Sequence, residues 1–159
     1  MALAPMADVT DAPFRRIIAK YGKPDVMFTE FVSADGLMLA NERGKARLKK
    51  DLIFIKEERP IVAQFFSSKP DMIEGAARLA RKLGFDGVDI NMGCPDKSVE
   101  RQGAGASLMK NHKLASELIA AAKRGAGPLP VSVKTRVGYN KVELDAWIPA
   151  LLECALAAI

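Results

Sequence analysis

Short apolar runs along the chain alternate with longer segments in which apolar residues recur every three or four positions. Runs of about four to eight apolar residues predict buried strands, and the longer spacing predicts amphipathic helices. Strands that alternate with helices predict an α/β fold, a parallel sheet covered by helices. The expected strands are 2–6, 26–31, 51–56, 61–66, 87–90 and 130–136. The run at 51–56 is expected at the periphery, which leaves five core strands.

Helices are expected between these strands, at 12–21, 33–40, 68–83, 111–125 and 142–154. The residues predicted to cap their N-termini are Asp11, Ser68 and Asn111. The residues predicted to end them are Gly22, Gly84 and Gly125. In the first helix, Phe14, Ile17 and Ile18 form the apolar side. Arg15 and Arg16 are expected to face solvent.

Polar residues stand at the ends of consecutive core strands, at Gln64, Asn91, Lys134 and Arg136. In (β/α)8 barrels the active site gathers at the carboxyl ends of the strands, so this placement predicts a barrel. A closed barrel needs about 250 residues, and this chain has 159. The sequence therefore predicts a partial TIM (β/α)8 barrel, roughly its first five βα units. A buried Gln64 amide must be hydrogen-bonded, either to a neighbour in the fold or to a ligand.

The segment 91–109, NMGCPDKSVERQGAGASLM, follows the strand at 87–90 and holds the candidate reactive residue, Cys94. Pro95 has no N–H, so the strand cannot continue through it. Gly103 and Gly105 permit backbone conformations and close approaches that a Cβ would block. Cys94 therefore lies on a loop just beyond the carboxyl end of a buried strand, where ligands bind in α/β proteins. An inert, packed cysteine is the alternative.

Composition excludes several classes of protein. Two cysteines in 159 residues make no disulfide framework, which favours a reducing, cytoplasmic location. One histidine and two distant thiols give no metal-binding spacing, so no metal site is expected. The N-terminus is not a signal peptide, and no apolar run approaches the ~20 residues that span a bilayer. No membrane association is expected.

The chain carries a net charge of +5, which suits a polyanionic partner such as nucleic acid. The segment 43–50, RGKARLKK, holds five basic residues and no acid. A solvated helix face is the favoured interpretation, and a phosphate-contacting patch is the alternative.

Several motifs together resemble one family. The segments MALAPMADVTDAPFRR, TEF, VAQFF, DINMGCPDKSVERQGAGASLM and VKTRVG occur in order along the chain. They resemble the tRNA-dihydrouridine synthases, flavin enzymes with a TIM-barrel catalytic domain and a C-terminal helical RNA-binding domain. One departure is Asp8, where many members of that family carry glycine.

The resemblance implies FMN as the cofactor and NADPH or NADH as the reductant. Pro5, Met6 and Ala7 would lie along the isoalloxazine ring. Gln64 would hydrogen-bond the pyrimidine edge of the ring. Lys134 would place its ammonium near flavin N1 and O2, where negative charge develops on reduction.

The resemblance also implies tRNA as the substrate, with specific uridines reduced to 5,6-dihydrouridine. Asn91 and Arg136 would hold the flipped-out uracil, and Cys94 would be the proton donor. Reduction of the C5–C6 bond needs a hydride at C6, from flavin N5, and a proton at C5. A free thiol has a pKa of about 8.5 and is mostly protonated near neutrality, so it can act as this acid.

The family's later strands, with an active-site histidine and the FMN phosphate site, would follow Ile159. The helical RNA-binding domain would follow them. We therefore expect residues 1–159 to form an incomplete FMN-binding barrel domain, from a truncated gene product or an incomplete sequence. Such a chain is expected to bind FMN weakly and to turn over little. His112 does not match the family's histidine, and we expect it at the surface.

Three alternatives remain open. Dihydroorotate and dihydropyrimidine dehydrogenases share the barrel, FMN and often a cysteine acid. A Schiff-base aldolase would use Lys134, beside the cationic Arg136, as its nucleophile. A non-catalytic RNA-binding remnant would use only the basic surface.

Overall fold

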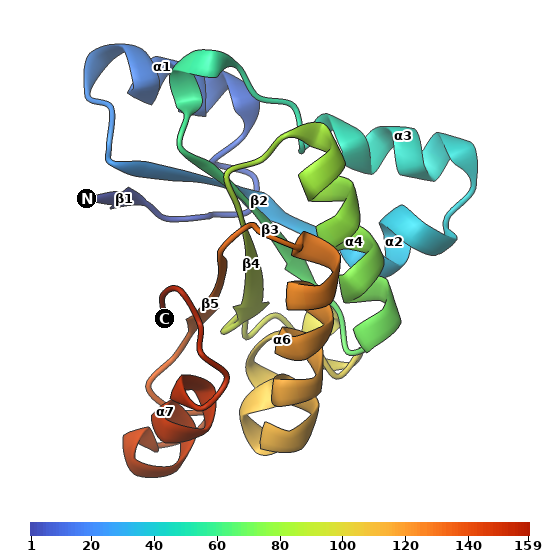
Figure 1. The fold of residues 1–159 in the computed structure, drawn as a ribbon, viewed down its shortest axis with the longest axis vertical. Coiled ribbons are helices and arrows are strands. Elements are labelled where there is room, and N and C mark those ends of the chain that lie inside the picture. The colour runs from blue at the N-terminus through green and yellow to red at the C-terminus, as the bar shows by residue number, and fades with distance from the viewer.

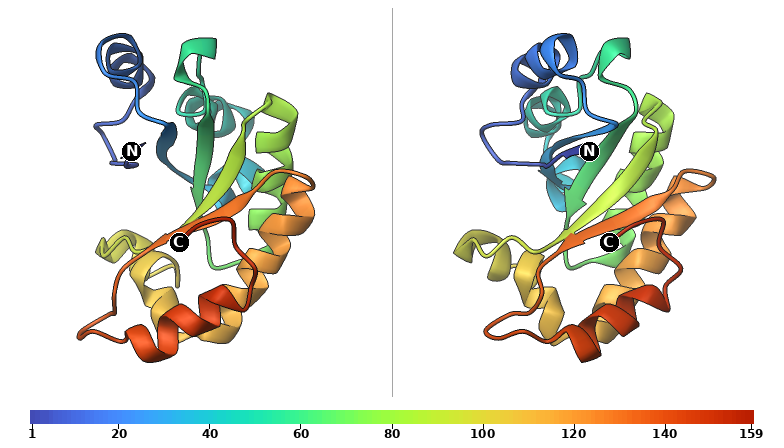
Figure 2. Two further views of the ribbon diagram at one scale, coloured as in Figure 1. Left: turned by 60° about the vertical axis from the view of Figure 1, so that its left-hand side comes forward. Right: turned by 90° about the vertical axis from the view of Figure 1, so that its left-hand side faces the viewer.

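The computed structural model describes residues 1–159 and contains one parallel sheet of five strands in the order β1-β2-β3-β4-β5 (Figure 1). The strands are β1 (Ala2–Leu3), β2 (Val26–Ser33), β3 (Ile61–Phe66), β4 (Gly87–Met92) and β5 (Val131–Thr135). Every neighbouring pair is parallel. The sheet curls into half of a barrel, with helices on its outer face (Figure 2). The predicted partial TIM barrel is confirmed.

Helices follow each strand in turn. They are α1 (Ala12–Tyr21), α2 (Ala34–Leu39), α3 (Glu42–Lys50), α4 (Pro70–Leu83), α5 (Lys97–Glu100), α6 (His112–Ala126) and α7 (Leu144–Leu152). Two 3-10 helices, η1 (Lys56–Glu58) and η2 (Gly105–Lys110), complete the set. The basic segment 43–50 is helical, because it lies within α3.

The main core lies between the sheet and the pair α4 and α6. Alternate residues of β3, Ile61, Ala63 and Phe65, are fully buried. Gly125 allows α4 and α6 to pack closely, since a Cβ there would lie 2.2 Å from the carbonyl oxygen of Glu74. The outward side of the strands is therefore sealed by helices, and chemistry is left to the concave side and the strand ends.

The predicted strand at 51–56 is wrong. These residues form a turn and an extended stretch that leads into η1, with no ladder to the sheet. Leu52 is buried and Phe54 packs on Phe85 at 4.6 Å between ring centroids. The apolar spacing therefore reflects packing of a loop against the core rather than strand pairing.

Two predicted helix boundaries also differ. Helix α4 begins at Pro70 after Lys69, and the Ser68 hydroxyl donates instead to the Gln102 carbonyl at 2.5 Å. Helix α6 continues through Gly125 to Ala126, and Gly127 follows it. The caps at Asp11 and Asn111 are confirmed, since each accepts a hydrogen bond from a backbone N–H of the first turn.

Arg15 is the largest error of orientation. Predicted to face solvent, it is fully buried and donates from Nε to Glu58 Oε2 at 2.6 Å. Its other nitrogens donate to the carbonyls of Thr10 and Ile53, both at 2.7 Å. Meanwhile Ile17, predicted on the apolar side, is 58% exposed. A partner 43 residues away in sequence draws Arg15 inward, whereas Arg16 is exposed and Ile18 packs against the core, as predicted.

The last residues of the chain run beside β5. The Val133 amide donates to the Ala158 carbonyl at 3.2 Å, and the Ala157 amide donates to the Val131 carbonyl at 2.9 Å. Ser132 and Ala158 form a parallel bridge. The residues at 157–159 thus continue the parallel order of the sheet on the far side of β5. No helix in the chain is long and apolar enough to cross a membrane.

Candidate active site at the carboxyl edge of the sheet

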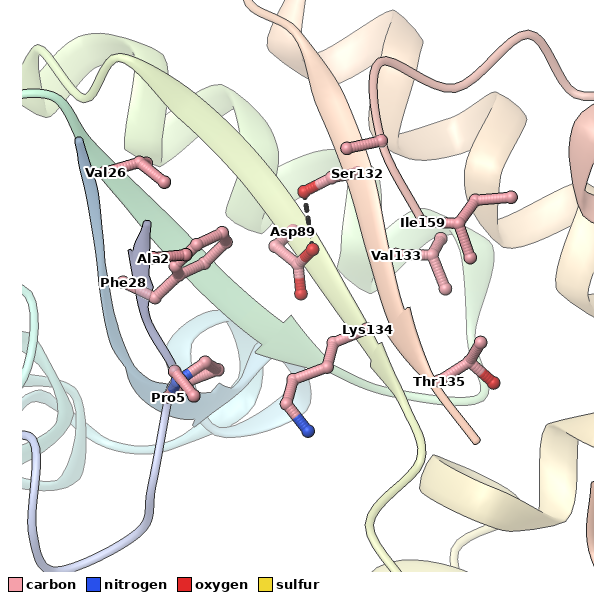
Figure 3. Close-up of a pocket in the computed structure, with 12 residues that line it drawn as sticks. Ala2, Pro5, Val26, Phe28, Asp89, Ser132, Val133, Lys134, Thr135 and Ile159 are labelled. Atoms are coloured by element: carbon pink, nitrogen blue, oxygen red, sulfur yellow. Dashed lines mark hydrogen bonds between the residues drawn. The ribbon is translucent and has the colours of Figure 1, made fainter. Parts of the chain in front are cut away.

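A cavity of about 430 Å³ opens on the concave side of the sheet (Figure 3). Its lining combines β1 and the segment after it with residues of β2, β4 and β5 and with Ala158 and Ile159. Pro5 and Lys134, two of the predicted cofactor-binding residues, both line it. Asp89 and Ser132 form its polar floor, joined by the hydrogen bond drawn in Figure 3.

A chain of hydrogen bonds links three strands behind this cavity. Gln64, fully buried on β3, donates from Nε2 to Asp89 Oδ2 on β4 at 2.6 Å. The side-chain oxygen of Gln64, Oε1, accepts from Asn91 Nδ2 at 3.1 Å. The Ser132 hydroxyl of β5 donates to the other Asp89 oxygen at 2.5 Å. The sequence left open whether the Gln64 amide is hydrogen-bonded to a neighbour in the fold or to a ligand. In the structure its partners are two neighbours in the fold, Asp89 and Asn91.

Asp89 is the acceptor at the centre of this network. Burial raises its pKa to about 6, against the hydrogen bonds from Ser132 and Gln64 and the positive charge of Lys134, which lower it. No ion pair offsets its burial, because the nearby ammonium of Lys134 forms none. A carboxyl group that titrates near neutrality therefore lies under the cavity.

Asn91 connects the network to the cysteine loop. Its side-chain oxygen accepts from the backbone amides of Gly93 at 3.2 Å and Cys94 at 2.9 Å. Asn91 is only 6% exposed. Its amide group thus bonds Gln64 with one end and fixes the start of the loop with the other.

The far side of the cysteine loop is held by η2. The Cys94 carbonyl accepts from the Ala106 amide at 2.9 Å. Gly105 has φ of +61°, and a Cβ there would lie 2.5 Å from the Cys94 carbonyl oxygen, so only glycine fits. The Cys94 thiol is half-buried and free of any disulfide. The predicted loop position of Cys94 is thereby explained by contacts on both sides.

Arg136 lies one residue beyond the end of β5 and reaches the same loop. Its Nε donates to the Gly93 carbonyl at 2.6 Å, while the residue itself is exposed. The Arg136 side chain therefore stands beside Cys94, outside the lining of the main cavity.

The segment after β1 turns back on itself at Thr10. The Thr10 hydroxyl accepts from the Met6 amide at 3.0 Å and donates to the Met6 carbonyl at 3.1 Å. Pro5 is half-buried, whereas Met6 and Ala7 are exposed and do not line the main cavity. Because Arg15 holds the Thr10 carbonyl, the position of this turn depends on the buried Arg15–Glu58 pair.

The sequence reasoning missed Asp89 and Ser132. Asp89 lies within the predicted strand 87–90, among apolar residues. A single acid within such a strand is itself a usable signal, because a buried carboxyl needs partners. His112, expected at the surface, is half-buried, with its ring 5.1 Å from that of Trp147.

The chain is similar in sequence to known proteins over most of its length. The sequence profile described as dihydrouridine synthase (Dus) matches residues 2–149. A probable tRNA-dihydrouridine synthase 2 of Bacillus subtilis is 44% identical over 156 residues, which are 98% of this chain and 47% of that protein. A probable tRNA-dihydrouridine synthase of Staphylococcus aureus strain COL is 41% identical over 145 residues, or 91% and 42% of the two chains.

The chain spans about half the length of the curated relatives it matches. Within that span the profile covers β1 through most of α7, including Gln64, Asn91, Cys94 and Lys134. The chain belongs to the dihydrouridine synthase family.

Proposed function

We propose that this chain forms the first part of the catalytic barrel of a tRNA-dihydrouridine synthase, in which Cys94 delivers a proton to a uracil. The observation that carries the proposal is the Asn91 side chain, which joins the Cys94 loop to the Gln64–Asp89 network. The backbone of Cys94 is thereby held near the end of β4, and Asn91 is the register partner of Lys134 on β5, which supports a role for both side chains at one base. Family membership supplies the reaction class.

The side chains around the cavity suit a flavin. Lys134 is exposed and free of ion pairs, so its charge is available to an anionic ring. Gln64 is fully buried and bonded to Asp89 and Asn91, so it would support the flavin site from behind the cavity. When bound, FMN would supply the hydride, with NADPH or NADH as its source of electrons. Pro5 and its neighbours Met6 and Ala7 would contact the ring at the open side.

The remaining roles fall to residues beside the thiol. Cys94 holds the proton that a C5 carbanion-like centre takes up, and Arg136 orients the uracil next to it. Asn91 has one free amide N–H after its bond to Gln64, which suits a uracil carbonyl. Its other role is to position the thiol loop. A tRNA loop is a suitable substrate, because its bases leave the stack at lower cost than those of a duplex.

The test is a single-turnover reaction with the protein in excess over an unmodified tRNA transcript, so that slow chemistry still yields product. FMN and NADPH are added, and dihydrouridine is measured by mass spectrometry of the nucleosides. We expect product with the wild type and a loss of roughly 100-fold or more with Cys94→Ala, in line with removal of a general acid.

Cys154→Ala is the matched control, since its thiol bonds only Ser116 and the Ala150 carbonyl at the α6–α7 contact. It should leave product formation unchanged. Product that forms equally with Cys94→Ala would refute the assignment of the proton donor. Absence of both FMN binding, followed by flavin absorbance, and product in the wild type would refute the proposed function as a whole.

A further inference from the structure

A group of exposed cations borders the cysteine loop and has no role in the chemistry above. It consists of Lys97, Arg101, Lys110 and Lys141, which we call the basic rim. None of the four forms an ion pair within the chain. By contrast, the exposed cations Lys69, Arg78 and Arg124 each contact a carboxylate. Unpaired exposed cations also occur elsewhere, for example on α3, so what distinguishes the basic rim is its position beside the cysteine loop.

Tyr139 joins the parts of the basic rim. Two hollows, of about 270 and 350 Å³, share Tyr139 and Lys110 in their linings. Lys97 and Arg101 line the first hollow, and Lys141 lines the second. The segments that carry them, α5 with η2 and the loop between β5 and α7, lie together at one end of the molecule (Figure 2).

Two nearby acids are hydrogen-bonded to Tyr139. The pKa of a third, Asp96, is lowered by hydrogen bonds from the first turn of α5, and the charge of Arg101 contributes to lowering it. Glu100 accepts from the Tyr139 hydroxyl at 3.2 Å, and Glu143 accepts from its backbone amide at 3.1 Å. Lys110 Nζ lies 3.5 Å from the centre of the tyrosine ring. A fixed aromatic ring among unpaired cations is the combination that proteins use on flexible RNA, with charge for phosphates and a ring for a base.

The basic rim leads directly to the reactive thiol. Helix α5 begins three residues after Cys94, and Arg136, whose Nε bonds the Gly93 carbonyl, precedes the loop that holds Tyr139. We propose that the basic rim binds the phosphates of the RNA nucleotides next to the uridine that enters the site. This inference rests on the proposed function for the identity of the substrate, and it assigns the path of the RNA backbone across the surface.

A second basic surface offers a comparison. On α3, Arg47, Lys49 and Lys50 are exposed and unpaired, and Arg43, Arg47 and Lys50 line a hollow of about 590 Å³. This surface packs beside α2 and the segment at Ala7 and Asp8, away from the cysteine loop. General attraction of a basic protein for RNA would use both surfaces alike, whereas the proposal predicts that the basic rim dominates.

The experiment compares two triple variants that each remove one arginine and two lysines. The rim variant is Lys97→Gln, Arg101→Gln and Lys110→Gln, and the α3 variant is Arg47→Gln, Lys49→Gln and Lys50→Gln. Binding of each chain to a fluorescent unmodified tRNA transcript is measured by anisotropy over a range of KCl concentrations. Thermal melting of each variant confirms folding.

For the rim variant we expect roughly tenfold to hundredfold weaker binding and a salt slope lower by about 2, as loss of three phosphate contacts predicts. The α3 variant should stay within about threefold of the wild type. Equal losses in both variants, or an unchanged rim variant, would overturn the proposal.

The outcome is separable from that of the proposed function. Cys94→Ala should bind the tRNA as tightly as the wild type, since the thiol contacts no phosphate. If no dihydrouridine forms but the rim variant alone loses RNA binding, the proposed chemistry fails and the RNA surface stands. If dihydrouridine forms and the rim variant binds normally, the chemistry stands and the RNA surface is wrong.

Discussion

Two buried polar clusters in this chain differ in how fully their charged groups are paired. In the first, Arg15 and Glu58 are both fully buried, and every nitrogen of the guanidinium has an acceptor. The second cluster, around Asp89, has no bonded cation and lies under an open cavity. In the first cluster every guanidinium nitrogen of Arg15 is bonded within the chain, and we call this cluster the closed clamp. The second cluster lies next to a cavity that a ligand could enter.

This difference shows that burial of charge does not by itself mark a functional site. The Arg15–Glu58 pair ties α1 to η1 and to the turn after β1, so its effect on chemistry is indirect. The pKa of Asp89, in contrast, is raised toward neutrality by burial, a trait common at active sites. What separates the clusters is the cavity and the free ammonium of Lys134 beside the second one.

The largest effect is expected when the closed clamp is broken. Glu58→Ala leaves the Arg15 charge buried without its carboxylate, which should destabilise the fold by about 3–5 kcal/mol. Urea denaturation measures the loss. The double variant Arg15→Met with Glu58→Met removes both charges and should be more stable than Glu58→Ala. A loss below about 1 kcal/mol for Glu58→Ala would mean that the clamp is not closed as described.

A smaller effect is expected at the link between network and loop. Asn91→Ala leaves the amides of Gly93 and Cys94 without an acceptor, at a cost of about 1–3 kcal/mol. The rate of Cys94 modification by a thiol reagent should rise, measured in a Cys154→Ala background. Asn140→Ala, at an exposed asparagine with no hydrogen bond from its side chain, is the control. An unchanged thiol reaction rate would show that Asn91 does not position the loop.

The smallest effect concerns the charge of Asp89. Because its native pKa is raised to about 6, the native state keeps a proton that the unfolded chain releases near pH 4. Stability from this group therefore increases as pH falls through 6, by about 1 kcal/mol between pH 7 and pH 5. Asp89→Asn should lose this part of the dependence in paired melts at the two pH values. Identical pH dependence in both proteins would contradict the raised pKa.

The sequence predicted the architecture well because apolar spacing reports local burial directly. The five core strands and the longer helices that follow them agree with the prediction, whereas the short α5 and η2 lie in a segment predicted only as a loop. The strand at 51–56 failed because a loop can satisfy the same spacing. The Ile53 carbonyl accepts from Arg15, a side chain distant in sequence, instead of from a neighbouring strand. Arg15 was predicted on the solvent side of α1 but is buried, because its partner Glu58 is distant in sequence.

The site was predicted in its residue types but not in its connections. Gln64, Asn91, Cys94 and Lys134 stand at strand ends that a pattern can recognise. That Asn91 joins Gln64 to the Cys94 amide depends on the register of β3 against β4, which spacing does not encode. The role of Asp89 was not predicted, because one acid between Val88 and Ile90 does not change the apolar pattern that predicts a buried strand.

The cysteine loop is anchored by Asn91 on one side and by the Ala106 amide on the other, with no space for a larger residue at Gly105. A thiol mounted on such a rigid support has little freedom to search for its target. In the proposed reaction the adaptation must therefore come from the RNA, and the proposal implies selection for nucleotides that can bend far enough to reach the sulfur of Cys94.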